Sequence, residues 1–450
     1  MRFFRIGKQV GSPLAMLVLA SAARAQTAAP APVLTIENAV GLALKGNRQV
    51  QSSAFDIERA REGTAAINTQ RLPQLQIYMM GGEALRPISF TIPEGALGVY
   101  PGIGPIPAQN SKITTPQQFT GLVFGQISQP LSQQWKIHLA SLSSRLGEEL
   151  AKEGLRQQQQ ETAHSVRDLY YQIAQTQTQI DTAEANVKYL VELQAETDRN
   201  LTEQSALKGD SLAVRAKLSQ QRYQLLTLRD TVATQKESLN RLLGRDLQTE
   251  FAVEAEPLPK ADEIDLAEAR KQAASQRAEI RQARLQTKKA EVEVRRQRAE
   301  YVPDLSVNLT YLSLPNVNFV PQNITQAGFL LQWQPFDWGQ KRHKTESLRY
   351  AVRQASLAEQ DAGQQVVLDV DAKFRSLAEA RALLDTAALS QEAEREKLRV
   401  VANRYGQKAA LLSDVLQQEA SVAQADAEYR KDLAAFWQAK ASFDRALGRN

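Results

Sequence analysis

The sequence predicts a mainly α-helical chain that adds strands to a membrane β-barrel and continues into a long α-helical coiled-coil barrel. Three observations predict this fold class. Two very long stretches without proline consist mostly of helix-forming residues. Four short segments alternate between apolar and polar residues. Both patterns occur twice in the same order, which indicates two tandem structural repeats.

The first element, residues 1–25, has the features of a secretory signal peptide. A basic start precedes a short apolar run at 13–20, and the small residues Ala23 and Ala25 mark a cleavage site. The mature chain is therefore expected to begin near Gln26. An apolar core segment is the alternative, but it leaves the order of charge, apolar run and cleavage site unexplained.

Composition limits where the exported chain can function. After the signal there is no run of about 18 apolar residues, so no transmembrane helix is predicted. The chain has no cysteine, which excludes disulfides, a thiol nucleophile and a lipid-anchored N-terminal cysteine. Its net charge of +5 is spread along helical stretches, so no basic patch for nucleic acid is present. The periplasm, the cell exterior and the outer membrane remain.

An internal repeat is the strongest feature of the mature chain. Residues 34–75 match 264–305 at a constant offset, and Asn240–Arg245 matches Asp444–Arg449 at a second offset. The predicted division is a first repeat at 26–248, a connection at 249–263 and a second repeat at 264–450.

Each repeat is predicted to run helix, strand, loop, strand, long helix and return helix. The expected N-cap of the first helix is Thr35 in the first repeat and Asp265 in the second. Gly244 or Gly448 is expected to end the return helix. The strand pairs are placed at about 73–131 and about 303–336.

The long helices are predicted at 136–203 and 341–404. At 1.5 Å per residue each would span about 100 Å. In their return helices an apolar residue recurs at every seventh position, which indicates coiled-coil packing. These residues are Leu218, Leu225, Val232 and Leu239 in the first repeat, and Val415, Val422, Tyr429, Phe436 and Phe443 in the second. Small and polar residues beside these seams favour a wide tube, and a solid antiparallel bundle is the alternative.

The strand segments suit a barrel with an apolar exterior and a polar lumen. Between Pro303 and Tyr311, apolar residues alternate with polar ones. In the second strand of the first repeat, Leu122 and Phe124 break this alternation. Four strands cannot close a barrel alone, and open edges are not tolerated in lipid. Other copies of the chain are therefore needed.

Prolines and tryptophans gather where strands should meet helices. Pro73, Pro130, Pro303 and Pro335 mark the four junctions. The predicted membrane-interface aromatics lie at the same level: Trp135, Trp333 and Trp338. Ordinary core packing is the alternative for each of these three.

This order of elements resembles the TolC-like outer-membrane efflux family over most of the mature chain, from Leu34 to Asn450. The matching segments are individually weak but occur in order: Leu34–Ala39, Arg71–Leu75, Tyr301–Leu305, Gln334–Asp337 and Ser413–Leu416. The resemblance implies a homotrimer, with a twelve-stranded barrel in the bacterial outer membrane and a helical barrel in the periplasm. It also implies a passive channel, not an enzyme, which docks to a periplasmic adaptor and an inner-membrane pump for efflux or type I secretion.

The resemblance places the periplasmic mouth at the two helix–helix turns. Asp210, Asp414 and Tyr405 match residues of the periplasmic aperture. Three copies of an acidic residue around a narrow axis would favour cations, whereas helix capping is the alternative role. The implied adaptor-contacting tips are Ser205, Leu207, Gly209, Ala409, Leu411 and Ser413. Ala410 replaces an arginine of some members, so an ion pair between Arg and Asp is not expected there, and Lys408 or Lys208 is the alternative cation.

No catalytic or metal-binding constellation is found in the sequence. His138, His164 and His343 are scattered, and nucleophile, phosphate-loop and zinc motifs are lacking. No metal and no cofactor are therefore expected. Two other classes are considered: a periplasmic adaptor or scaffold, which should have one long hairpin flanked by small β-domains, and a secreted enzyme, for which no site exists.

Overall fold

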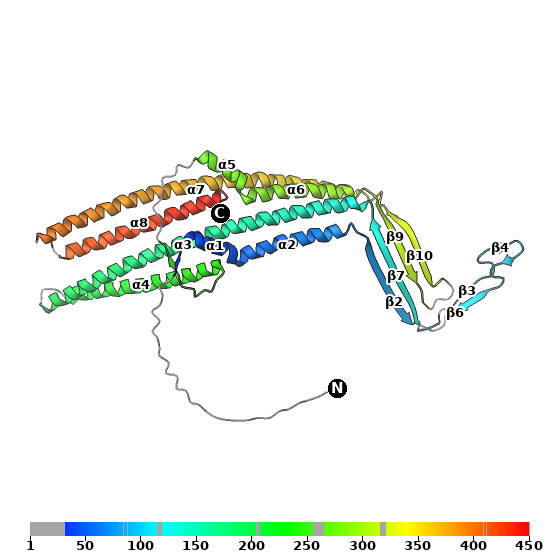
Figure 1. The fold of residues 1–450 in the computed structure, drawn as a ribbon, viewed down its shortest axis with the longest axis horizontal. Coiled ribbons are helices and arrows are strands. Elements are labelled where there is room, and N and C mark those ends of the chain that lie inside the picture. Colours follow the sequence, from blue (N-terminus) through cyan, green and yellow to red (C-terminus); the bar gives the residue numbers. More distant parts are fainter. Residues whose placement is uncertain are drawn as a thin grey trace, which may run out of the picture.

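The computed structural model describes residues 32–83, 85–87, 89–114, 119–203, 208–254, 265–315, 321–407, 409–410 and 412–449. The predicted signal peptide and most of the predicted connection lie outside these residues. The molecule is elongated, with helices along most of its length and strands at one end (Figure 1).

The helices form two sets with the same order. The first set is α1 (Ile36–Gly46), α2 (Arg48–Thr69), α3 (Gln133–Thr202) and α4 (Lys208–Leu243). The second is α5 (Leu266–Gln276), α6 (Ala278–Ala299), α7 (Gln340–Gly406) and α8 (Leu412–Ala446). The two long helices predicted from the sequence are thus present as α3 and α7, with 70 and 67 residues.

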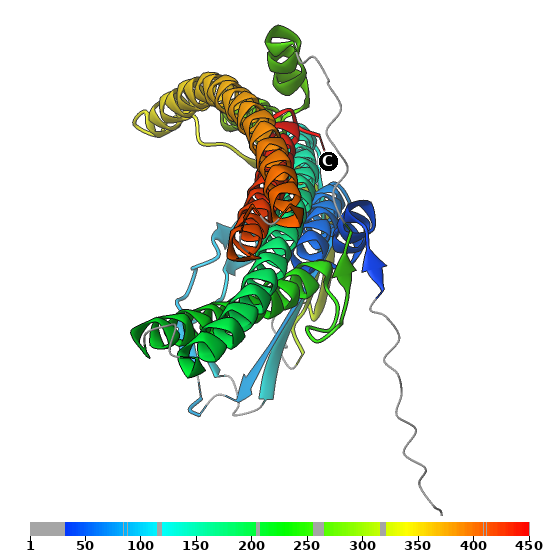
Figure 2. The same cartoon turned by 90° about the vertical axis from the view of Figure 1, so that its left-hand side faces the viewer.

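The helices pack as a bent wall. Nearest the strands the order is α2, α3, α6 and α7, and towards the tips it is α4, α3, α8 and α7. Seen from its left-hand end, the molecule shows these helices along an arc (Figure 2). A solid four-helix bundle would bring α4 against α7, but these two helices lie at opposite edges of the wall. The packing therefore favours a segment of a tube.

The predicted caps and seams explain where the helices start, stop and touch. The Thr35 hydroxyl accepts from the Asn38 amide at 3.3 Å, and the Asp265 carboxylate accepts from the Ala267 amide at 2.9 Å. Gly244 ends its helix with φ of 71°, where a Cβ would meet the Gly46 carbonyl oxygen at 2.0 Å. Along the seams Leu239 and Phe443 are fully buried, as the heptads predicted.

The strands form one antiparallel sheet in the order β10–β9–β7–β2. Their bounds are β2 Gln74–Glu83, β7 Phe119–Pro130, β9 Asp304–Ser313 and β10 Asn323–Gln332. The mainly helical fold with four strands and two tandem repeats, as predicted, is confirmed. Two complete helical hairpins also distinguish the chain from an adaptor with a single hairpin.

Two smaller features were not predicted. β1 (Val33–Leu34) pairs in parallel with β8 (Ala252–Val253) and so joins the chain start to the segment after the first repeat. The loop between β2 and β7 carries two short antiparallel pairs. These pairs are β3 (Ser89–Ile92) with β6 (Ser111–Thr114), and β4 (Val99–Tyr100) with β5 (Gly104–Pro105). They extend beyond the sheet (Figure 1).

Candidate functional site: two open edges and the helical tips

The sheet has two open edges and one apolar face. Among the described strands, β2 and β10 each pair on one side only, so each leaves a row of backbone donors and acceptors without a strand partner there. On one face the side chains are apolar and open to the surroundings, as Met79 at 76% and Phe329 at 78% exposure illustrate. On the other face Ser306 and Asn308 are buried. The sheet thus has one apolar face, and buried polar groups lie on the opposite face.

The helical wall also has two open edges, and each continues from an open edge of the sheet. The edge formed by α7 exposes apolar side chains on its surface, namely Tyr350, Leu357, Leu368, Leu383 and Leu389. The opposite edge, formed by α2 and α4, also exposes apolar side chains, namely Phe55, Leu212, Tyr223 and Leu226. An apolar surface of this extent is typical of a protein interface.

The predicted tryptophans lie at the junction of strands and helices. Trp135 is in the first turn of α3, Trp333 directly follows β10, and Trp338 precedes α7. All three are more exposed than buried, with Trp338 reaching 88%. Trp338 adopts a φ of 54° and its ring meets that of Phe336 at 4.7 Å between centroids.

The tips of the two helical hairpins lie at the same end of the molecule, the end that is farthest from the sheet (Figure 1). Asp414 is exposed in the first turn of α8, and Tyr405 is 44% exposed in the last turn of α7. Since α4 begins at Lys208 and α8 at Leu412, both Asp210 and Asp414 lie inside their helices. The helix dipole favours a carboxylate in the first turn, as at Asp414, and neither aspartate occupies the N-cap position.

The predicted adaptor-contacting residues are described in part. Gly209 and Ala409 are exposed. Ser205, Leu207 and Leu411 lie outside the described residues, and the side chains of Asp210 and Ser413 also lie outside what the structure describes.

The hydrogen bonds and the ion pair that join the two helices of each hairpin near its tip were not predicted from the sequence. The Ser211 hydroxyl donates to Asp198 at 2.7 Å, and Arg215 pairs with Asp198 at 3.1 Å. The Ser211 hydrogen bond, followed by that of Arg215, lowers the pKa of the Asp198 carboxyl. In the other hairpin Gln418 donates to Glu394 at 2.7 Å. The only indication in the sequence was that the two partners of each pair lie a similar number of residues before and after the turn.

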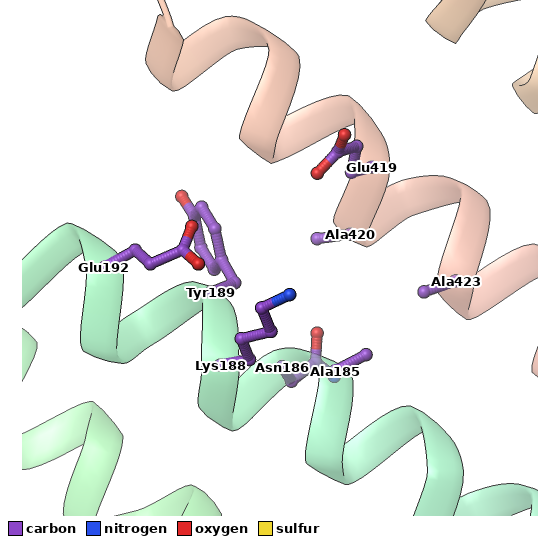
Figure 3. Close-up of a pocket in the computed structure, with 8 residues that line it drawn as sticks. All are labelled: Ala185, Asn186, Lys188, Tyr189, Glu192, Glu419, Ala420 and Ala423. Atoms are coloured by element: carbon purple, nitrogen blue, oxygen red, sulfur yellow. The ribbon is translucent and has the colours of Figure 1, made fainter.

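A groove separates the two hairpins on the surface of the wall. Near the tips it is lined by Ala185 of α3 and by Ala420 and Ala423 of α8, with Lys188 and Glu419 at its sides (Figure 3). This part has a volume of about 220 Å³. Two further hollows, of about 440 and 600 Å³, follow the same seam between α3 and α8. Small residues at the floor allow another helix to approach closely.

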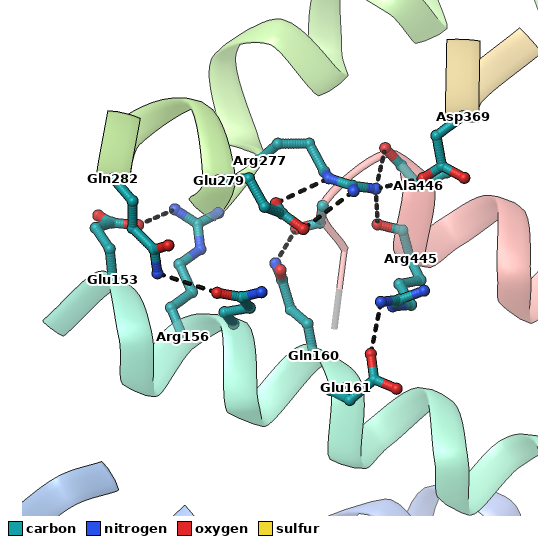
Figure 4. Close-up of polar contacts among 12 residues, drawn as sticks. Glu153, Arg156, Gln160, Glu161, Arg277, Glu279, Gln282, Asp369, Arg445 and Ala446 are labelled. Atoms are coloured by element: carbon teal, nitrogen blue, oxygen red, sulfur yellow. Dashed lines mark hydrogen bonds and ion pairs between the residues drawn. The ribbon is translucent and has the colours of Figure 1, made fainter. Parts of the chain in front are cut away.

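A buried arginine anchors the second return helix (Figure 4). The Arg277 side chain is 9% exposed and pairs with Glu279 at 3.0 Å and with Asp369 at 2.9 Å. It also donates to the carbonyl oxygens of Arg445 and Ala446 at the end of α8. The arginine therefore joins the break between α5 and α6 to both α7 and α8.

The first repeat uses an uncharged residue for the same purpose. Asn47, at the break between α1 and α2, donates to the Leu242 carbonyl at 2.9 Å and accepts from the amides of Gln49 and Val50. By the two repeat offsets, Asn47 corresponds to Arg277 and Leu242 to Ala446. The two repeats thus hold their return helices by equivalent contacts with different chemistry.

No helix in the part of the chain that the structure describes is both long enough and apolar enough to cross a membrane. The described residues also contain no cluster of three His, Cys, Asp or Glu side chains that could hold a metal ion.

Comparison with known proteins gives one family and one fold. The family model described as outer membrane efflux protein matches residues 269–449. No curated protein matches the chain at a significant level.

Solved structures resemble the chain over almost its whole length. The Campylobacter jejuni CmeC outer membrane channel has a TM-score of 0.74 at 14% identity, covering 92% of this chain and 85% of that one. The Vibrio cholerae outer membrane protein VceC has a TM-score of 0.69 at 14% identity, covering 92% and 96%. The open state of the Neisseria gonorrhoeae MtrE outer membrane channel has a TM-score of 0.68 at 15% identity, covering 92% and 89%.

Proposed function

We propose that this chain is the passive outer-membrane exit channel of a tripartite efflux or type I secretion system, because residues 269–449 match the family model of outer membrane efflux proteins. We infer from this match that the sheet lies in the outer membrane and that the helices lie in the periplasm. One observation carries the proposal: the chain is a segment of tube wall whose two edges are unlike each other and both open.

Unlike edges favour a closed ring of identical subunits. The edge with β10 and α7 of one copy can pair with the edge that has β2, α2 and α4 of the next, and such head-to-tail contacts close when the rotation permits. Pairing of β10 with β2 satisfies the open backbone groups, as lipid requires. Three copies give twelve strands, an even number as in other outer-membrane barrels. We therefore propose a homotrimer.

The tips and the groove between the hairpins are the proposed docking site of a periplasmic adaptor. The groove combines a floor of alanines with a lysine and glutamates at its sides, which suits a polar helix of the partner. The tips offer two exposed residues, Gly209 in the first turn of α4 and Ala409 between α7 and α8. The adaptor in turn would connect the duct to an inner-membrane pump, which supplies the energy.

The proposed periplasmic aperture is formed by Asp210, Asp414 and Tyr405 of each copy. Replacing both aspartates, Asp210→Ala with Asp414→Ala, is expected to raise single-channel conductance severalfold and to weaken cation preference, because like charges around the axis are removed. Planar-bilayer recordings measure both quantities. Asp230→Ala with Asp361→Ala, on the same hairpins but away from the tips, is the matched control and should change neither. Conductance and selectivity equal to wild type would remove the aspartates from the aperture.

Deleting the gene and measuring the sensitivity of the cells to a panel of toxic compounds tests the function as a whole. Increased sensitivity, restored by the wild-type gene, is expected for an exit channel. In the same cells, the protein should remain in outer membranes after carbonate washing. A protein that washes off, with unchanged sensitivity of the deletion strain, would contradict the proposal.

A further inference from the structure

The lumen side of the sheet changes from polar to apolar towards its outer end. Strand register places one residue from each strand side by side in a continuous row across the sheet. We call polar row the set Gln76, Gln126, Thr310 and Gln326. The next row outward on the same face, which we call the apolar row, is Tyr78, Phe124, Leu312 and Ile324.

The apolar row accounts for the interruption seen in the sequence. Phe124 breaks the alternation of β7 because it occupies a lumen-side position, between Tyr78 and Leu312 in register. Leu122 lies on the same side one step farther out, opposite Met80. A wall that only conducts water and ions has no need for apolar groups here, and the polar row shows that this sheet can supply polar ones.

The two aromatic rings of the row are held in place and left accessible. The Tyr78 and Phe124 rings lie 6.0 Å apart between centroids. The Tyr78 hydroxyl donates to Gln76 in the polar row at 3.1 Å, so its polar tip is satisfied within the wall. Tyr78 is 56% exposed and Ile324 37%. The row therefore offers ordered apolar surface to whatever passes.

The neighbouring loops, where described, do not cover this row. The segment with β3 to β6 extends beyond the end of the sheet (Figure 1). Pro315, after β9, lies against Gly121, where an added Cβ would come within 3.1 Å of its side chain. Gly121 belongs to the outward-facing set of β7, because it alternates with Leu122.

The proposed barrel is too wide for the apolar row to act as a gate that closes the channel by excluding water. Twelve tilted strands at the usual spacing give about 24 Å between opposite backbones. Side chains from the apolar row would line such a lumen without filling it, and dewetting needs a narrow constriction. In a lumen of this width, the apolar row instead offers a surface that passing molecules can contact.

We infer that the apolar row is a transient binding surface for apolar or aromatic organic molecules on their way out. The inference rests on the proposed trimeric channel and adds the chemical class of its cargo. The row carries no charge, and neither does the polar row beneath it, so neither a metal ion nor a strongly charged solute finds a complementary partner there. Twelve such side chains in a trimer would retain an aryl compound by stacking and apolar contact.

Block of single channels by tetraphenylphosphonium in planar bilayers tests this inference. Tetramethylammonium, which has the same charge and no aryl surface, is the probe control. Wild-type channels are expected to show blocks of measurable dwell time with the aryl cation only. Tyr78→Gln with Phe124→Gln, which copies the polar row, should shorten the dwell about tenfold, since each aromatic contact contributes several-fold.

Variants separate the possible results. Thr310→Ser with Gln326→Asn, which keeps the polar row polar and leaves the Tyr78–Gln76 hydrogen bond in place, should leave the dwell time unchanged. If the aromatic variant does not insert, Leu312→Gln with Ile324→Gln replaces it with the same expectation. Wild-type channels that conduct but show no aryl-specific block, or variants that block like wild type, would overturn the binding surface and leave the channel intact. Absence of any wild-type conductance would instead overturn the proposed function.

Discussion

Arg277→Ala is expected to lower the free energy of unfolding by about 3 kcal/mol, because it removes one buried cation from two carboxylates and two helix-end carbonyls. Glu279 and Asp369 would remain close together without their shared partner, and the carbonyl oxygens of Arg445 and Ala446 would lose the hydrogen bonds from Arg277. Calorimetry of the detergent-solubilised protein measures the shift in unfolding temperature.

Arg270→Ala is the matched control for this prediction. Arg270 also links the α5 side of the wall to α7, through Asp371 at 2.7 Å, but its side chain is 44% exposed. Loss of an exposed pair is expected to cost clearly less than loss of the buried one. Equal destabilisation by the two variants would show that burial of Arg277 contributes nothing.

The first repeat suggests how the loss can be recovered. Arg277→Asn with Glu279→Gln and Asp369→Ser copies the residues at the equivalent positions, Asn47, Gln49 and Ser165. An asparagine there can cap α6 as Asn47 caps α2, and no carboxylate is left unpaired. The triple variant is therefore expected to be more stable than Arg277→Ala. A triple variant less stable than the single one would contradict the equivalence of the two anchors.

Leu309→Arg is expected to prevent stable membrane insertion. Leu309 lies in the middle of β9 on the apolar face and is 46% exposed. An arginine facing lipid near the middle of the bilayer costs about 3 kcal/mol in each copy, and all copies carry it. The fraction of protein that resists carbonate extraction from outer membranes measures the effect.

The adjacent residue provides the control for the face assignment. Thr310 follows Leu309 in the same strand but belongs to the polar row on the lumen side. Thr310→Arg should therefore insert normally and shift ion preference towards anions. Normal insertion of Leu309→Arg, or failed insertion of Thr310→Arg alone, would reverse the inside and outside of the sheet.

Features encoded by local patterns were predictable from the sequence. The caps at Thr35 and Asp265, the glycine ends of the return helices and the heptad seams depend on residues close together in the chain, and the structure confirms them. The mainly helical fold with four strands followed from the same patterns and from the repeat.

Features that depend on pairing between distant segments were not predictable. Arg277 lies 92 residues from Asp369 in the sequence, and nothing in the local sequence links the two. The apolar row was visible only as an irregularity at Leu122 and Phe124, since its meaning requires the register of four strands. The roles of Asp210, Asp414 and Tyr405 came from the family resemblance and stay predictions.

The mass of the protein–detergent particle, determined by light scattering after subtraction of the detergent, tests most directly whether one chain is an incomplete wall. We expect a particle that contains three chains, and we expect the protein to stay in outer membranes until detergent is added. A single-chain particle, stable in buffer without detergent, would contradict it, because edges and an apolar face such as these would then need no partner.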